Sequence, residues 1–139
     1  MKLLIYTDGW ARFNPGPAGI GVFITDENGK KIEARYKYLG IATNNQAEYQ
    51  WALHGIRRGI ELGATEIELR MDSNLVVEQL SLNFKIKNPE LKVIFEEIQK
   101  MVKSWGGKIT YIHIRREFNK EADRLSNVAM DEWEKWTMK

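Results

Sequence analysis

The sequence predicts one α/β domain, residues 1–139, built on a mixed five-stranded sheet covered by helices. Two observations lead to this fold class. The first 40 residues alternate into strands separated by Gly, Pro, Asp and Asn turns, which is typical of an antiparallel meander. From Thr43 onward, apolar residues recur at helical spacing between two short apolar runs. Strands joined through helices pair in parallel by right-handed crossovers, so two parallel strands should follow the three antiparallel ones.

The three antiparallel strands are bounded by turn residues. Residues 2–7 (KLLIYT) form a buried apolar run that Asp8 and Gly9 should close. A corner rich in Gly and Pro follows at 14–19, before a second strand at 20–25. The segment 26–29 (DENG) predicts a hairpin turn into a third strand at 31–39.

The helical half begins with a capping signature. Thr43 should be the N-cap of a helix ending at Gly63, since Gln46 follows it by three residues. The remaining segments, in order, are a strand at 66–71, a short helix at 73–80, a helix opened by Pro89 and ended by Gly106, a strand at 108–114 and a last helix from Asn119 to about residue 135.

Composition excludes several classes of protein. The chain has 139 residues, 43% of them hydrophobic, a formal net charge of +2, no cysteine and two histidines. Disulfides, thiolate catalysis and cysteine zinc sites are therefore impossible. The apolar start is too short for a secretory signal, and no stretch is long enough to span a membrane. We expect a cytoplasmic monomer without a membrane partner.

Four carboxylates should meet at one end of the sheet. Asp8 and Asp72 close the first and fourth strands, while Glu48 and Asp123 lie in the first turns of helices. Ligands gather at the ends of adjacent parallel strands in such sheets. Carboxylates crowded there repel one another unless a cation lies between them, and oxygen donors without His or Cys favour Mg²⁺ or Mn²⁺.

Each carboxylate also has a purely structural interpretation. Asp8 before Gly9 suits a turn, and Glu48 could complete a capping box with Asn45. Asp72 could cap the short helix, and Asp123 could complement a helix dipole. These interpretations do not explain why all four should fall at one end of one sheet.

Four segments resemble type 1 ribonuclease H. They are 6–9 with 14–21 (YTDG and NPGPAGIG), 43–49 (TNNQAEY), 71–77 (MDSNLVV) and 119–127 (NKEADRLSN), and their order and spacing fit that family across the chain. The resemblance implies a ribonuclease H-like fold and an endonuclease that hydrolyses the RNA strand of RNA–DNA hybrids, leaving 5′-phosphate and 3′-hydroxyl ends. It also implies two Mg²⁺ ions, with Mn²⁺ as an alternative, held by Asp8, Glu48, Asp72 and Asp123, with Asp8 bridging both.

The resemblance further implies which residues contact the hybrid. Recognition of the 2′-hydroxyl would fall to backbone and amide groups, and a threonine would help to hold a DNA phosphate. The matching positions are Gly9, Asn14, Asn44, Asn45 and Asn74 for the first role, and Thr43 for the second. Arg115 and Arg116 lie in a loop where relatives carry a histidine, and we expect them to contact phosphate in its place.

The sequence also departs from the family pattern. Trp10 follows Asp-Gly where a small residue is common, and the loop at 115–118 carries no histidine. Residues 82–88 are too few for a basic protrusion, so we expect the bare catalytic domain without an N-terminal hybrid-binding module. A hybrid-binding domain without activity, and another metal nuclease such as an exonuclease or resolvase, are the alternatives. Retention of four carboxylates disfavours the first, and the amide-rich segment 43–46 disfavours the second.

Overall fold

The computed structural model describes residues 1–137, except the side chains of Trp10 and residues 133–137. Five strands, four α-helices and one short 3-10 helix make up this part of the chain. In order they are β1 (Lys2–Ala11), β2 (Gly16–Asp26), β3 (Lys31–Ala42), α1 (Asn44–Glu61), β4 (Glu66–Met71), α2 (Asn74–Leu80), α3 (Pro89–Trp105), β5 (Lys108–His113), η1 (Arg116–Phe118) and α4 (Lys120–Thr137).

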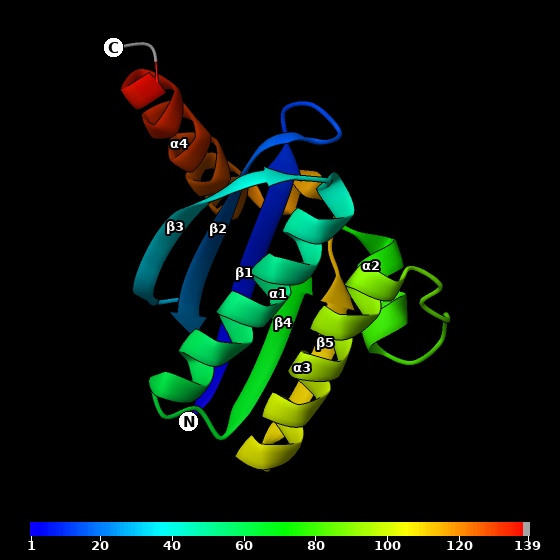
Figure 1. Cartoon of the computed structure of the whole chain (residues 1–139). Helices are drawn as coiled ribbons and strands as arrows, with labels where there is room; N and C mark the ends of the chain where they lie inside the picture. The colour runs from blue at the N-terminus through cyan, green and yellow to red at the C-terminus, as the bar shows by residue number, and fades with distance from the viewer. Residues whose placement is uncertain (138–139) are drawn as a thin grey trace.

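The strands form one sheet in the order β3-β2-β1-β4-β5. The pairs β1–β2 and β2–β3 are antiparallel, whereas β1–β4 and β4–β5 are parallel. Helices α1, α2 and α3 cover one face, and α4 lies against the other face over β2 and β3 (Figure 1). The predicted mixed sheet with three antiparallel and two parallel strands is confirmed.

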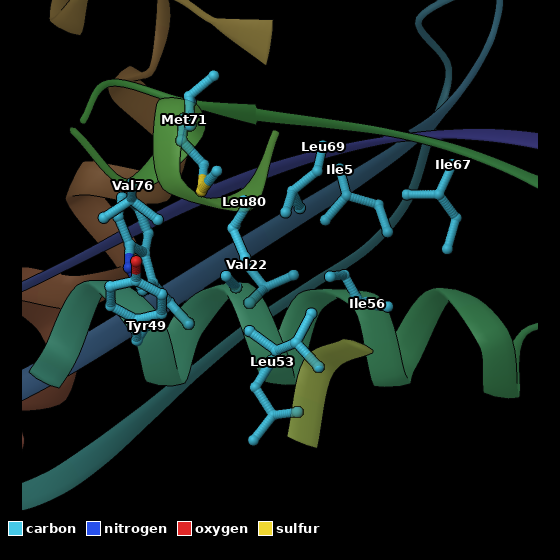
Figure 2. Packing of buried hydrophobic residues seen from close by; sticks show 14 of the residues in the cluster. Ile5, Val22, Tyr49, Leu53, Ile56, Ile67, Leu69, Met71, Val76 and Leu80 are labelled. Carbon is cyan, nitrogen blue, oxygen red and sulfur yellow. The ribbon is translucent and has the colours of Figure 1, made fainter. Parts of the chain in front are cut away.

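The two sides of β1 and β2 serve different helices. Leu3 and Ile5 of β1 pack with Ile56 of α1 in the main core, which Figure 2 shows from close by. The opposite side of β2 carries Gly19 and Gly21, where an added Cβ would meet backbone atoms of α4 at 2.6 and 2.2 Å. Because these positions lack a Cβ, α4 can lie directly on the sheet.

The predicted caps are confirmed. The Thr43 hydroxyl accepts from the Gln46 backbone N–H, and the Gln46 side chain accepts from the Thr43 N–H, which is a complete capping box. Pro89 opens α3, and Gly106 ends it with a left-handed φ of 75°. Residues 81–88 join α2 to α3 without a helix, as the sequence predicts.

The boundary of the first strand is wrong in the sequence prediction. β1 runs on to Ala11 because its antiparallel pairing with β2 continues to Ala18, whereas its parallel pairing with β4 ends at Thr7 and Met71. Asp8 therefore lies inside the strand, just beyond the parallel ladder, and does not close it. The Gly-Pro corner is likewise part of β2 from Gly16 onward.

Two of the tryptophans on helices pack into or against the main core. Trp51 is fully buried and Trp105 is partly buried, with its indole N–H donating to the Ala64 carbonyl. Trp133, Trp136 and Trp10 have side chains outside the described part.

An ion pair between β3 and α1 gives a test of the packing of these elements. Both guanidinium nitrogens Nε and Nη2 of Arg58 donate to the Glu33 carboxylate, at 2.6 and 2.7 Å. Hydrogen bonding to Arg58 and the charge of Arg35 lower the pKa of Glu33 below its ordinary 4.5. A lowered carboxyl pKa stabilises the folded state above the unfolded pKa, and this contribution is lost as pH falls through the folded pKa.

We therefore expect Glu33→Gln to lower the melting temperature by a few degrees at pH 7. The difference from the unmodified protein should shrink as pH falls from 4.5 through the lowered pKa of folded Glu33, and close below that pKa, where Glu33 is protonated and neutral like glutamine. Thermal unfolding followed by circular dichroism between pH 3 and 7 measures this. The control is Glu27→Gln in the exposed hairpin turn, and an equal loss at every pH would contradict the ion-pair interpretation.

Candidate active site

The four predicted carboxylates line one cleft of about 390 Å³. It lies where the sheet changes from antiparallel to parallel pairing. Its lining comes from β1, α1, α4 and the segments that follow β4 and β5, and consists of Asp8, Gly9, Asn44, Glu48, Asp72, Arg116, Asp123 and Asn127.

The fold brings these carboxylates together from four distant parts of the chain. Asp8 and Asp72 directly follow the paired residues Thr7 and Met71 of adjacent parallel strands. Glu48 lies near the N-terminal end of α1, and Asp123 lies in the first turn of α4. The sheet thus supplies two neighbouring aspartates, and one helix on each face supplies the other acids.

Asp8 is the most enclosed of the four. It is 5% exposed, and its Oδ2 lies 3.2 Å from the Ser126 hydroxyl of α4. Burial raises the pKa of Asp8 to about 8, with further contributions from hydrogen bonding to Asp123 and from the negative charge of Asp72 and Asp123. Burial and the neighbouring acids disfavour the charged form of Asp8. A cation in the cleft would favour that charged form and so offset their effect.

Glu48 and Asp72 are held by polar neighbours. The Ser73 hydroxyl donates to Glu48 Oε2 at 3.2 Å, yet burial raises the pKa of Glu48 to about 7. Asn119 Nδ2 lies 3.5 Å from Asp72 Oδ2 and donates to the Thr7 carbonyl at 2.8 Å. Burial also raises the pKa of Asp72, while Asn119 and Arg116 oppose that effect.

Two of the structural interpretations are wrong. Ser73, and not Asp72, caps α2, because its hydroxyl accepts from the Val76 N–H. Gln46, and not Glu48, completes the capping box of α1. Both carboxylates are therefore free to face the cleft.

The donor set fits a hard divalent cation that keeps part of its hydration. Within the described residues, no group of three Asp, Glu or His side chains is arranged to hold an ion by itself. Mg²⁺ is usually bound through one or two carboxylates, with water and substrate phosphate filling its other positions. Four carboxylate side chains and no sulfur or imidazole line this cleft, which suits that mode of binding.

The predicted substrate residues divide into two groups. Gly9, Asn44 and Arg116 line the cleft, and Arg116 Nε lies 3.9 Å from Asp72 Oδ2. Asn44 Oδ1 accepts from the Ala11 N–H at 2.7 Å, and Asn14 Oδ1 accepts from the Asn44 N–H at 3.1 Å. This network fixes the start of α1 against the loop after β1.

The other predicted substrate residues lie outside the cleft lining. Asn45 is exposed at the start of α1, and Asn74 is exposed at the start of α2. Thr43 is engaged as the N-cap of α1, and Arg115 is 79% exposed with Glu117 at 3.9 Å.

Sequence reasoning missed the polar residues that support the acids. Asn127 lines the cleft and donates to the Asp123 carbonyl at 3.0 Å, while Ser126 and Asn119 contact Asp8 and Asp72. Ser126 and Asn127 follow Asp123 by three and four residues on α4, so they share its side of the helix. That spacing was the signal available in the sequence.

This sheet order, with four acids at the change of pairing, defines the class of ribonuclease H-like proteins. A family profile described as "Reverse transcriptase-like" matches residues 6–129. The chain is 36% identical over 130 residues to the Ribonuclease HI of Halobacterium salinarum, covering 91% of this chain and 63% of the relative. It is 42% identical over 132 residues to the Bifunctional protein Rv2228c of Mycobacterium tuberculosis, covering 94% of this chain and 36% of the relative.

Solved structures of ribonuclease H proteins are similar to this chain over nearly its whole length. The RNase H1 of Halobacterium salinarum has a TM-score of 0.91 at 32% identity, covering 95% of this chain and 99% of that one. LC11-RNase H1, solved in complex with RNA/DNA hybrid, has a TM-score of 0.90 at 42% identity, with 94% and 97% covered. The N-terminal RNase H domain of Rv2228c has a TM-score of 0.88 at 40% identity, with 94% and 99% covered. This chain belongs to the type 1 ribonuclease H family.

The chain spans about a third of the length of the mycobacterial relatives and less than two thirds of the Halobacterium one. No helix among the described residues is long and apolar enough to cross a membrane.

Proposed function

We propose that this protein is an endonuclease that hydrolyses the RNA strand of RNA–DNA hybrids with the help of two divalent cations, Mg²⁺ or Mn²⁺. The observation that supports this most strongly is the convergence of Asp8, Glu48, Asp72 and Asp123 in one cleft of a ribonuclease H-like fold. The relative LC11-RNase H1, solved with RNA/DNA hybrid, supports the same substrate class.

The chain's own groups would bind and orient the reactants. Asp8, the most enclosed of the four carboxylates and in contact with Ser126 of α4, would help to hold the ions. Asp72 and Glu48 would complete one site and Asp123 the other. When bound, two such ions activate a water and stabilise the leaving oxygen of an in-line displacement, so the products would carry 5′-phosphate and 3′-hydroxyl ends.

Arg116 supplies positive charge at the rim of the acidic cleft. Its side chain is 84% exposed and lies within 3.9 Å of Asp72, so it can reach a phosphate without leaving the site. A guanidinium offers N–H donors and no acceptor, so this side chain is suited to bind phosphate and not to act as a base. Arg115, which points from the same loop and is also exposed, offers a second phosphate contact.

Selectivity for RNA requires contacts to the 2′-hydroxyl, the group that DNA lacks. Gly9 and Asn44 line the cleft, and Asn14 holds Asn44 in place. Asn45 in the first turn of α1 and Asn74 at the start of α2 are both exposed. We propose that these groups read the minor groove, and that Thr43 adds a contact to a phosphate.

The proposed activity is tested with four duplexes that share one sequence. A hybrid with a labelled RNA strand, a hybrid with a labelled DNA strand, double-stranded RNA and double-stranded DNA are each incubated with the protein in Mg²⁺. Cleavage confined to the RNA strand of the hybrid is expected. Binding of the hybrid without any cleavage would favour a hybrid-binding domain, and cleavage of DNA would favour another metal nuclease.

Asn45→Ala should chiefly weaken discrimination between RNA and DNA. One good polar contact contributes about 1–3 kcal/mol to recognition, so we expect about a tenfold or greater loss of kcat/KM on the hybrid. We measure kcat/KM on two substrates, a duplex that carries a single ribonucleotide and a hybrid with a continuous RNA strand, for the variant and for the unmodified protein. Gln99→Ala on α3 is the control, and an equal loss on every substrate would contradict the proposed role.

A further inference from the structure

A second polar groove lies between β3 and α1, apart from the carboxylate cleft. A pocket of about 210 Å³ has Ile20 and Val22 in its lining, together with Arg35, Lys37, His54 and Arg57. A neighbouring pocket of about 350 Å³ shares Lys37 and His54 and reaches Gln46 in the first turn of α1. Together the two pockets form one groove, here called the β3–α1 groove.

The positive charge of this groove is only partly neutralised, although Glu61 at the end of α1 also lines it. Arg58 and Arg35 are paired with Glu33, at 2.6 and 3.2 Å. Arg57 has only a distant partner, Glu97 at 3.9 Å, and both side chains are about half exposed. Among the described residues, Lys37 and the His54 imidazole take part in no hydrogen bond or ion pair that the structure shows.

His54 is placed where an anion would be favourable. It is half-buried, and burial together with the nearby positive charges of Lys37 on β3 and Arg57 on α1 lowers its pKa. Glu97 of α3 acts in the opposite direction but is the weakest of these influences. A phosphate between these three groups would be attracted by all of them and would favour the charged imidazole.

We propose that the β3–α1 groove binds backbone phosphates of a nucleic-acid strand outside the carboxylate cleft. From Gln46 to Arg57 the groove follows α1 for about 16 Å, at about 1.5 Å per residue, which is longer than one phosphate group. The groove ends at Gln46, which lies in the first turn of α1 together with Asn44 of the carboxylate cleft. This inference rests on the proposed function, since it extends the binding of the same hybrid beyond the site of cleavage.

Binding is tested with the double variant Lys37→Gln/Arg57→Gln, made in an Asp72→Asn background so that the RNA strand stays intact. Both residues are exposed, so the variant should fold. With an 18-base-pair hybrid we expect the slope of log Kd against log salt to fall by about two and the affinity to fall about tenfold. The control is Lys103→Gln/Lys108→Gln, which removes the same charge from exposed positions on α3 and β5. Equal slopes for the groove variant and the control would overturn the proposal.

The imidazole of His54 gives a second measurement that does not depend on cleavage. The chain has only two histidines, so His54→Gln assigns the proton signals. We expect the 18-base-pair hybrid to raise the pKa of His54. A hybrid of about six base pairs, which is too short to reach the groove, should leave that pKa unchanged. Inorganic phosphate and a nucleoside monophosphate are the further arms. A shift caused by these alone, without one from the long hybrid, would show a site for small phosphorylated ligands and contradict the proposal.

Failure of this inference is distinguishable from failure of the proposed function. In the otherwise unmodified chain, Lys37→Gln/Arg57→Gln should cleave the short hybrid at the normal rate, because neither residue lines the carboxylate cleft. A salt slope no smaller in the groove variant than in the control, together with normal cleavage by the unmodified protein, would reject the groove alone. Absence of cleavage by the unmodified protein would reject the nuclease alone.

Discussion

Asp72→Asn should abolish cleavage of hybrids while leaving the fold intact. The substitution removes one negative charge from the cleft with almost no change in volume, and the neutral amide can still accept from Asn119. Metal-assisted stabilisation of the transition state contributes several kcal/mol, so kcat should fall by about a thousandfold or more. The rate is measured in excess Mg²⁺, with the far-ultraviolet circular dichroism spectrum and melting temperature recorded beside it.

The matched control for this prediction is Glu96→Gln, which removes one negative charge from an exposed position on α3. It should retain full activity. Because burial and crowding raise the pKa of Asp72, the metal-free Asp72→Asn protein should be at least as stable as the unmodified one. Full activity of Asp72→Asn would contradict the assignment of this carboxylate to the metal site.

Gly21→Ala should both destabilise the protein and impair its active site. An added Cβ would lie 2.2 Å from the Ala122 carbonyl oxygen and 2.7 Å from the Ser126 nitrogen, both in the backbone of α4. Since backbone atoms cannot rotate away, α4 must shift outward, and we expect a loss of about 3 kcal/mol or more in the free energy of unfolding. Asp123 would move with its helix, so activity should fall even where the variant is folded.

Gly40→Ala separates this steric effect from the general effect of replacing a glycine. Nothing lies near a Cβ added at Gly40, but its φ of +86° is in the left-handed region. We expect a loss of only about 1–2 kcal/mol and normal activity. Chemical denaturation of both variants, with hybrid cleavage measured below the transition, makes the comparison. Equal stabilities for the two variants would contradict direct packing of α4 on β2.

The sequence predicts the sheet and the helix starts because local patterns determine them. The capping box at Thr43 and Gln46 and the proline at position 89 lie at the positions expected of them. The end of β1 was less predictable. Asp8 and Gly9 have turn propensity, but the ladder with β2 runs past them to Ala11, and cross-strand pairing outweighed the local preference.

Within the candidate site, the positions of the acids were predictable and their supports were not. Asp8 and Asp72 follow adjacent parallel strands, a relation that the order of elements already implies. The contact between Ser126 and Asp8 joins residues 118 positions apart. It depends on how closely α4 approaches β2 at Gly21, which no local pattern reports. Lys37 and His54, which line the same pocket, are likewise brought together only because α1 lies across the sheet (Figure 1).

The proposed nuclease activity requires that Asp8, Glu48, Asp72 and Asp123 together hold divalent cations beside the phosphodiester of the RNA strand. The most direct test is end-group analysis of RNA fragments released from a hybrid in Mg²⁺, in Mn²⁺ and in EDTA. We expect 5′-phosphate and 3′-hydroxyl ends in either metal, no products in EDTA, and none from Asp72→Asn. Fragments ending in a 2′,3′-cyclic phosphate, or cleavage that persists in EDTA, would contradict it.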